Sequence, residues 1–330
     1  MEKISSFDQV VGNIPESEKD KILRNKGERF DNQVFEELIG KEREKTSEEL
    51  EIISFANEAT NEVRRKYGLE DFDIPSKNIH VVTEEAWPRE KSTAFYNSMV
   101  QGIAMREKMS KLAFMKTVFH EMLHFKSYGA AQITTGENTE LDEYRLGLTV
   151  HTRDGKKLYF INLNEAVTEE MTKRFASELL KKELFADEIA QTQDVIRNYP
   201  QATTDSGKPL FDEDTFYAEV QESQNWRDAT DRLFGRRILG SGVTNISIEG
   251  FTYKAERKIL NTLIDKIFER NPEEFYDREE VFEVFVKGMI TGNILPIGRL
   301  IEQTFENGTL RKIGELDNDI QAQEKFVNSL

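Results

Sequence analysis

The chain has 330 residues, enough for one large domain or two ordinary ones, with 32% charged residues, a net charge of −16 and no cysteine. The acidic balance argues against nucleic acid and anionic membranes as partners, and the absence of cysteine excludes disulfides, thiolate metal ligands and cysteine nucleophiles. No apolar run approaches the roughly 18 residues that a membrane span needs, and the N-terminus lacks the pattern of a secretory signal, so we expect a cytoplasmic protein.

The first half of the chain predicts a charged arm followed by mixed helices and strands. Residues 1–50 are dense in glutamate and lysine and predict a helical arm with a solvated surface. Closer apolar spacing predicts a helix over 52–68, followed by a loop and a strand at "NIHVV". A second strand is predicted within 98–107, and a helix from about Ser110 that ends at Gly129.

The second half changes from strands to helices. The polar stretch 130–144 predicts irregular structure, and residues 145–162 predict two strands joined by a turn at Asp154 and Gly155. One helix is predicted from 162–164 to about Arg197, before a polar boundary at 201–209. We therefore predict an α+β fold with a charged helical arm (1–50), a domain built on a small mixed sheet (51–200) and a mainly helical C-terminal subdomain (201–330).

Two of the chain's only 4 histidines lie four residues apart in the predicted helix, with a glutamate directly after the first. Positions i and i+4 share one helix face, so the imidazoles of His120 and His124 can bind one zinc ion. Glu121 lies about 100° around the helix, a poor place for a ligand but a suitable one for a general base acting on a water. The alternative is a buried helix whose two histidines bond to neighbours, which leaves Glu121 unexplained.

A catalytic zinc ion keeps three protein ligands, so a third must come from elsewhere in the chain. The metzincin motif H-E-x-x-H-x-x-G-x-x-H is excluded because Ala130 stands at the place of its third histidine. We therefore expect an acidic ligand, and two candidates compete. Glu165 lies in "LNEAVTEEM", where Asn162 and Glu165 could instead form a capping box, and Glu143 lies in "ELDEYRLG".

The pair H-E-x-x-H and N-E-x-x-x-E resembles the two motifs of the gluzincin metallopeptidases. The resemblance implies a zincin-like fold for 51–200 and one zinc ion (Zn2+) per chain. It implies that Glu165 is the third ligand and that Glu169, one turn later, orients a zinc-binding histidine. It also implies hydrolysis of peptide bonds in a peptide or protein substrate, with Glu121 taking a proton from the water and giving it to the leaving amine.

The resemblance suggests further groups that would act on the substrate. Gluzincins often stabilise the oxyanion with a tyrosine or histidine; here Tyr159 is the first candidate and His151 the second, although both could be ordinary strand residues. Zincins commonly bind the substrate as an added strand at a sheet edge before the metal helix. The segment that could serve begins with Gly102, Ile103 and Ala104, unless it is an ordinary paired strand.

Two other functions remain open on the sequence. The chain could be a zincin-like protein that binds metal but acts as a non-catalytic interaction module through its helical half, or a zinc hydrolase of non-peptide amides. Glu121 argues against the first, because a non-catalytic site has no evident need for it. Loss of hydrolysis of an unfolded protein in Glu121→Gln, with zinc retained, would favour the peptidase.

Overall fold

The computed structural model mixes helices and small sheets, which fits the predicted α+β class, and describes residues 5–31, 38, 40–87, 92–107, 109–134, 140–204, 207–221 and 245–330. The elements as far as residue 106 are β1 (Gln9–Val11), α1 (Glu16–Asp31), β2 (Glu42–Arg43), α2 (Ser47–Lys66), β3 (Ile79–Val82), β4 (Ala94–Asn97) and β5 (Gly102–Arg106). Next come α3 (Lys111–Lys126), β6 (Gly129–Thr134), β7 (Glu140–Leu146), β8 (Thr149–His151), β9 (Leu158–Tyr159), α4 (Ile161–Leu179) and α5 (Ala186–Asn198). The last are β10 (Thr215–Gln221), β11 (Asn245–Gly250), α7 (Lys254–Arg270), α8 (Arg278–Thr291), α9 (Leu295–Thr304), α10 (Thr309–Glu315) and α11 (Ile320–Ser329).

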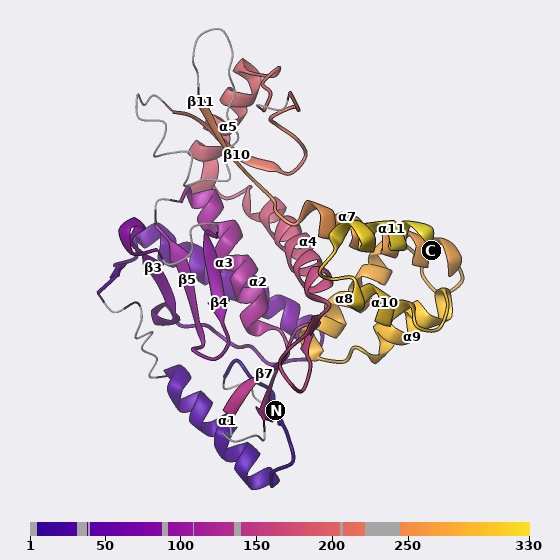
Figure 1. Cartoon of the computed structure of the whole chain (residues 1–330). Helices are drawn as coiled ribbons and strands as arrows, with labels where there is room; N and C mark the ends of the chain where they lie inside the picture. The colour runs from indigo at the N-terminus through magenta and orange to yellow at the C-terminus, as the bar shows by residue number, and fades with distance from the viewer. Residues whose placement is uncertain are drawn as a thin grey trace.

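Helices α3 and α4 lie side by side at the centre of the molecule (Figure 1). A four-stranded sheet with the order β2-β3-β5-β4 lies on one side of them, and α7 to α11 lie on the other. One hydrophobic core joins the inner faces of α2, α3, α4, α7 and α8. Of the residues that the structure describes, no helix is long and apolar enough to cross a membrane.

The expectation that Gly102, Ile103 and Ala104 offer a free sheet edge is wrong. They belong to β5, which pairs in parallel with β3 on one side and antiparallel with β4 on the other. Both rows of backbone hydrogen-bonding groups are therefore used within the sheet. Among the described strands, β4 is the edge on this side, because it pairs with β5 alone.

Helix α3 begins at an identifiable side-chain cap. The Ser110 side chain accepts a hydrogen bond from the Ala113 N–H, and the Glu188 carboxylate accepts two more from Lys111 and Leu112. These groups satisfy backbone donors that have no partner inside the helix. Nearly all of α3 is buried, so packing on several sides holds its side chains in place.

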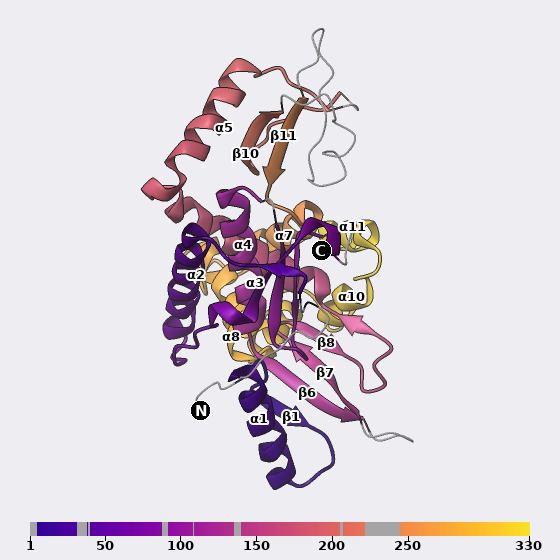
Figure 2. The same cartoon turned by 90° about the vertical axis from the view of Figure 1, so that its left-hand side faces the viewer.

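The polar stretch 130–144, predicted to be irregular, contains most of β6 and β7, which join β1, β8 and β9 in a second sheet (Figure 2). Helix α3 ends at Lys126 and not at Gly129, which is the first residue of β6. A Cβ atom at Gly129 would lie 2.1 Å from the Ser6 carbonyl oxygen, so this glycine permits close approach of the N-terminal segment. The predicted turn at Gly155 does join two strands, β8 and β9.

The single helix predicted to reach Arg197 is two helices, α4 and α5, separated by a short turn at Glu183–Phe185. Phe185 in that turn is fully buried, which fixes the break. The remainder of the chain is mainly helical, as predicted, but it also contains the β10–β11 hairpin, which packs on α5 in a small separate core. Residues 222–244 lie outside the described part.

Candidate metal centre

Three side chains from two helices bring their ligand atoms to one point. His120 and His124 lie on one face of α3, and their Nε2 atoms are 3.1 Å apart. Glu165, in the second turn of α4, places Oε2 3.3 Å from Nε2 of His120 and 3.4 Å from Nε2 of His124. The structure therefore brings the three predicted ligands together, although Glu165 lies 41 residues after His124 in the chain.

These separations fit a tetrahedral metal ion. Ligands about 2.0–2.2 Å from zinc in tetrahedral geometry lie about 3.3–3.6 Å from one another, within a few tenths of an ångström of the three distances here. Oε2 of Glu165 is buried and makes no hydrogen bond of normal geometry in the described part of the chain, which is unusual for a carboxylate oxygen. Within that part, His120, His124 and Glu165 form a cluster that could hold a metal ion.

Glu169 fixes the orientation of the first histidine. It lies one turn after Glu165 on α4, is fully buried, and places Oε2 2.8 Å from Nδ1 of His120. Its other oxygen accepts hydrogen bonds from the Thr252 N–H at 2.6 Å and hydroxyl at 2.9 Å, and lies 2.9 Å from Nζ of Lys116. With the Nδ1 proton directed to Glu169, the lone pair of Nε2 faces the other two ligand atoms.

The charges of this cluster shift its pKa values strongly. Burial acts to lower the pKa of His120, but the adjacent carboxylates of Glu165 and Glu169 outweigh it and raise that pKa to about 9. The pKa of Glu169 is lowered: burial opposes ionisation, but Lys116 and His120 together overcome it. Without metal, His120 is therefore protonated at neutral pH, and a metal ion must displace that proton.

The surroundings of His124 differ from those of His120. Its Nδ1 lies 3.3 Å from the amide nitrogen of Asn164, whose oxygen accepts a hydrogen bond from the Leu148 N–H. An amide N–H facing Nδ1 favours the tautomer of His124 with its proton on Nε2, so metal binding requires this ring to change tautomer.

The alternative role for Glu165, a capping box with Asn162, is not what the structure has. The residue before α4 is Phe160, with positive φ and no side-chain cap, and the first N–H of the helix, at Ile161, donates to Asp317. The Asn162 amide donates to the Asp317 carbonyl oxygen and to Gln323. The Glu165 side chain therefore does not cap the start of α4.

Tyr253 lies at the metal centre, and the sequence analysis missed it. Its ring stacks on that of His120, with centroids 5.7 Å apart and planes 8° from parallel. Burial raises its pKa, and so do the negative charges of Glu165 and Glu121 and a hydrogen bond to Glu165. Its backbone φ of 53° lies in the left-handed region, directly before α7. Nothing in "GFTYKAER" marks such a residue, because the fold alone brings it to α3.

The other predicted residues lie elsewhere. Glu143 accepts a hydrogen bond from the Ser98 hydroxyl and lies 3.0 Å from Nε2 of His151. These two candidates therefore pair with each other across β7 and β8, and neither joins the His120–His124 cluster within the described residues. Tyr159 is half-buried on β9, where its ring contacts Phe160. The structure does not bring Glu143, His151 or Tyr159 to the metal ligands.

Comparison of the chain with protein-family models, curated proteins and solved structures finds no match.

Proposed function

We propose that this protein is a zinc-dependent metallopeptidase with His120, His124 and Glu165 as metal ligands. The observation that carries the proposal is the set of three distances, 3.1, 3.3 and 3.4 Å, between two imidazole nitrogens and one carboxylate oxygen. Two nitrogens and one oxygen are a donor set that suits zinc, and three protein ligands leave a fourth position for water or substrate. A purely structural zinc site is usually closed by four protein ligands.

The mechanism needs a base, an oriented ligand and a donor to the oxyanion. His120, His124 and Glu165 would hold a zinc ion, which would supply the Lewis acid that polarises the scissile carbonyl and lowers the pKa of a water. Glu121 accepts the proton of the attacking water and passes it to the leaving amine. Glu169 keeps His120 in the required tautomer. The Tyr253 hydroxyl, whose raised pKa keeps it protonated, donates to the developing oxyanion in place of Tyr159 or His151.

The edge of β4 is the surface that we propose for the substrate backbone, in place of β5. Strand β4 (Ala94–Asn97) is the outer strand on this side of the described sheet and packs on α3. An extended peptide can add to such an edge through main-chain hydrogen bonds, which requires little of its sequence. We therefore expect broad cleavage of unfolded protein.

Zinc content and hydrolysis, measured on the same preparations, test the proposal. We expect about one zinc ion per wild-type chain by elemental analysis, loss of zinc in His124→Ala, weaker binding in Glu165→Ala, and hydrolysis of an unfolded protein by wild type. Glu121→Gln should keep zinc and lose hydrolysis. Glu143→Ala is the matched control: it removes a carboxylate outside the cluster and should keep the metal.

Two outcomes would overturn the proposal. If wild type binds no divalent metal after reconstitution, the paired histidines are structural. If zinc is bound but neither peptides nor proteins are cleaved, the chain is a metal-binding module or acts on another amide.

A further inference from the structure

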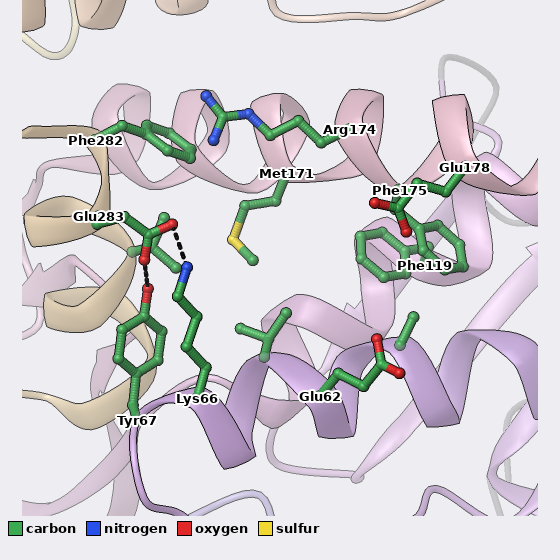
Figure 3. Close-up of a pocket in the computed structure, with 13 residues that line it drawn as sticks. Glu62, Lys66, Tyr67, Phe119, Met171, Arg174, Phe175, Glu178, Phe282 and Glu283 are labelled. Carbon is green, nitrogen blue, oxygen red and sulfur yellow. Dashed lines mark hydrogen bonds and ion pairs between the residues drawn. The ribbon is translucent and has the colours of Figure 1, made fainter. Parts of the chain in front are cut away.

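A pocket lies between α2, α4 and α8 (Figure 3). Its volume is about 290 Å3, near the lower limit for sites that bind small molecules. Phe119, the residue before His120, lines it from α3. The pocket is lined in part by α3 and α4, the helices that carry the candidate metal ligands. None of the ligand side chains lines it, so the pocket is a separate site.

The inside of this pocket is apolar and partly aromatic. Val63 of α2, Met171 and Phe175 of α4, and Val286 of α8 line it together with Phe119. The rings of Phe119 and Phe175 stack with centroids 3.7 Å apart. Such a lining suits the apolar body of a ligand, an aromatic ring or a short alkyl chain, and the methionine can adapt to its shape.

The positive groups at the rim are already neutralised. Nζ of Lys66 lies 2.7 Å from the Glu283 carboxylate, which also accepts a hydrogen bond from the Tyr67 hydroxyl. The Arg174 guanidinium pairs with Glu279 and lies 3.8 Å from the centre of the Phe282 ring. Neither cation is free for an anionic ligand, because each would have to give up its present partner.

Two carboxylates at the rim have no such partner. Glu62 on α2 and Glu178 on α4 line the pocket on the side of the Phe119–Phe175 pair, one from each helix (Figure 3). Both are exposed, and in the part of the chain that the structure describes neither side chain forms an ion pair or hydrogen bond. The pocket lining therefore carries three carboxylates, Glu62, Glu178 and Glu283, against two cations, Lys66 and Arg174, next to an apolar interior.

We propose that this pocket binds a small organic cation, an amine joined to an aromatic or alkyl body, with the ammonium group between Glu62 and Glu178. The apolar body lies over Val63 and Met171, and the ammonium group stays close to the mouth and in contact with water. Charge complementarity decides the sign of the ligand, and the apolar lining requires more than a bare metal ion or ammonium.

The first test compares three probes of one shape, 4-phenylbutylamine, 4-phenylbutanol and 4-phenylbutyrate, titrated onto the full chain by ligand-observed NMR in the presence of a chelator. Removing metal ensures that the amine cannot bind through zinc. We expect saturable binding of the amine, about three- to tenfold weaker binding of the alcohol, and weaker binding still of the acid. Equal binding of amine and alcohol would overturn the proposal, as would absence of saturable amine binding.

Two variants place the binding in this pocket. Glu62→Gln with Glu178→Gln should weaken amine binding about three- to tenfold and leave alcohol binding unchanged, because both side chains are exposed and only charge is removed. Val63→Trp should remove binding of both by filling the pocket. Glu51→Gln, an exposed change on α2 outside the pocket, is the control. Unchanged amine binding in the double variant, or in Val63→Trp, would overturn the proposal, whether or not the chain is a peptidase.

Discussion

The raised pKa of His120 predicts that the metal-free protein loses stability as the pH rises. The folded pKa is about 9, against an ordinary value of 6.5. A base whose pKa is higher in the folded state contributes stability that is complete below about pH 6.5 and is lost as the pH rises through about 9. With zinc bound the direction reverses, because the metal competes with that proton and binds more tightly as the pH rises.

The size of the effect follows from the shift. A change from 6.5 to about 9 corresponds to about 3 kcal/mol at 1.36 kcal/mol per pKa unit. His120 is only 5% exposed, so solvent screening reduces this little. The value is a large part of the roughly 5–15 kcal/mol by which an ordinary domain is stable.

Urea unfolding between pH 6 and pH 10, with a chelator present, measures the effect. His120→Gln is the matched comparison, since its amide can still donate to Glu169 but carries no charge. The comparison is needed because Glu249 and Lys126, with pKa values of about 8 and about 7, titrate in the same range. We expect the difference in unfolding free energy between wild type and variant to shrink by about 3 kcal/mol from pH 6 to pH 10. A difference that stays constant with pH would refute the reasoning.

Three further predictions concern single side chains. Tyr253→Phe should keep zinc and lower kcat on a peptide substrate about 10²- to 10³-fold, and an unchanged kcat would remove Tyr253 from the mechanism. Asn164→Asp should raise zinc affinity about tenfold in a chelator competition assay, because a carboxylate accepts the Nδ1 proton of His124; lower affinity would contradict this. Burial, with Glu188 and Glu219 nearby, raises the pKa of Glu249 to about 8, so its ionisation destabilises the fold as the pH rises from 4.5 through 8. Glu249→Gln should therefore increase the unfolding free energy by about 1–3 kcal/mol at pH 9 and by less at pH 5, measured by urea unfolding.

Local patterns predicted helix α3 and the side chains that form the candidate metal cluster. Four-residue spacing places His120 and His124 on one face wherever the segment is helical, and the same rule places Glu165 and Glu169 one turn apart on α4. Both spacings follow from helix geometry alone, once an apolar face has packed each helix into the fold. Nothing local fixes the distance between the two helices, which depends on packing such as the Phe119–Phe175 stack.

Pairing between distant segments explains what the sequence did not reveal. Strand β6 forms beside β1, which lies more than a hundred residues earlier, so the polar composition of 130–144 did not identify it. Strand order likewise decides which strand has backbone hydrogen-bonding groups left for a substrate. Strand β5 has the stronger apolar pattern, so it lies inside the sheet, and β4 lies at the edge.

The C-terminal part of the chain contributes side chains to the candidate metal centre, so a truncated fragment would contain only part of the site. Thr252 donates two hydrogen bonds to Glu169, and Tyr253 stacks on His120, from the short link between β11 and α7. Arg257 on α7 then joins that helix to α4 through Glu170, at 2.8 Å. A fragment that ends near residue 200 would keep all three candidate ligands and Glu169, but it would lose Thr252, which bonds to Glu169, and Tyr253, which stacks on His120. We therefore expect such a fragment to bind metal more weakly than the full chain, since partners of this kind affect metal affinity about 10- to 100-fold.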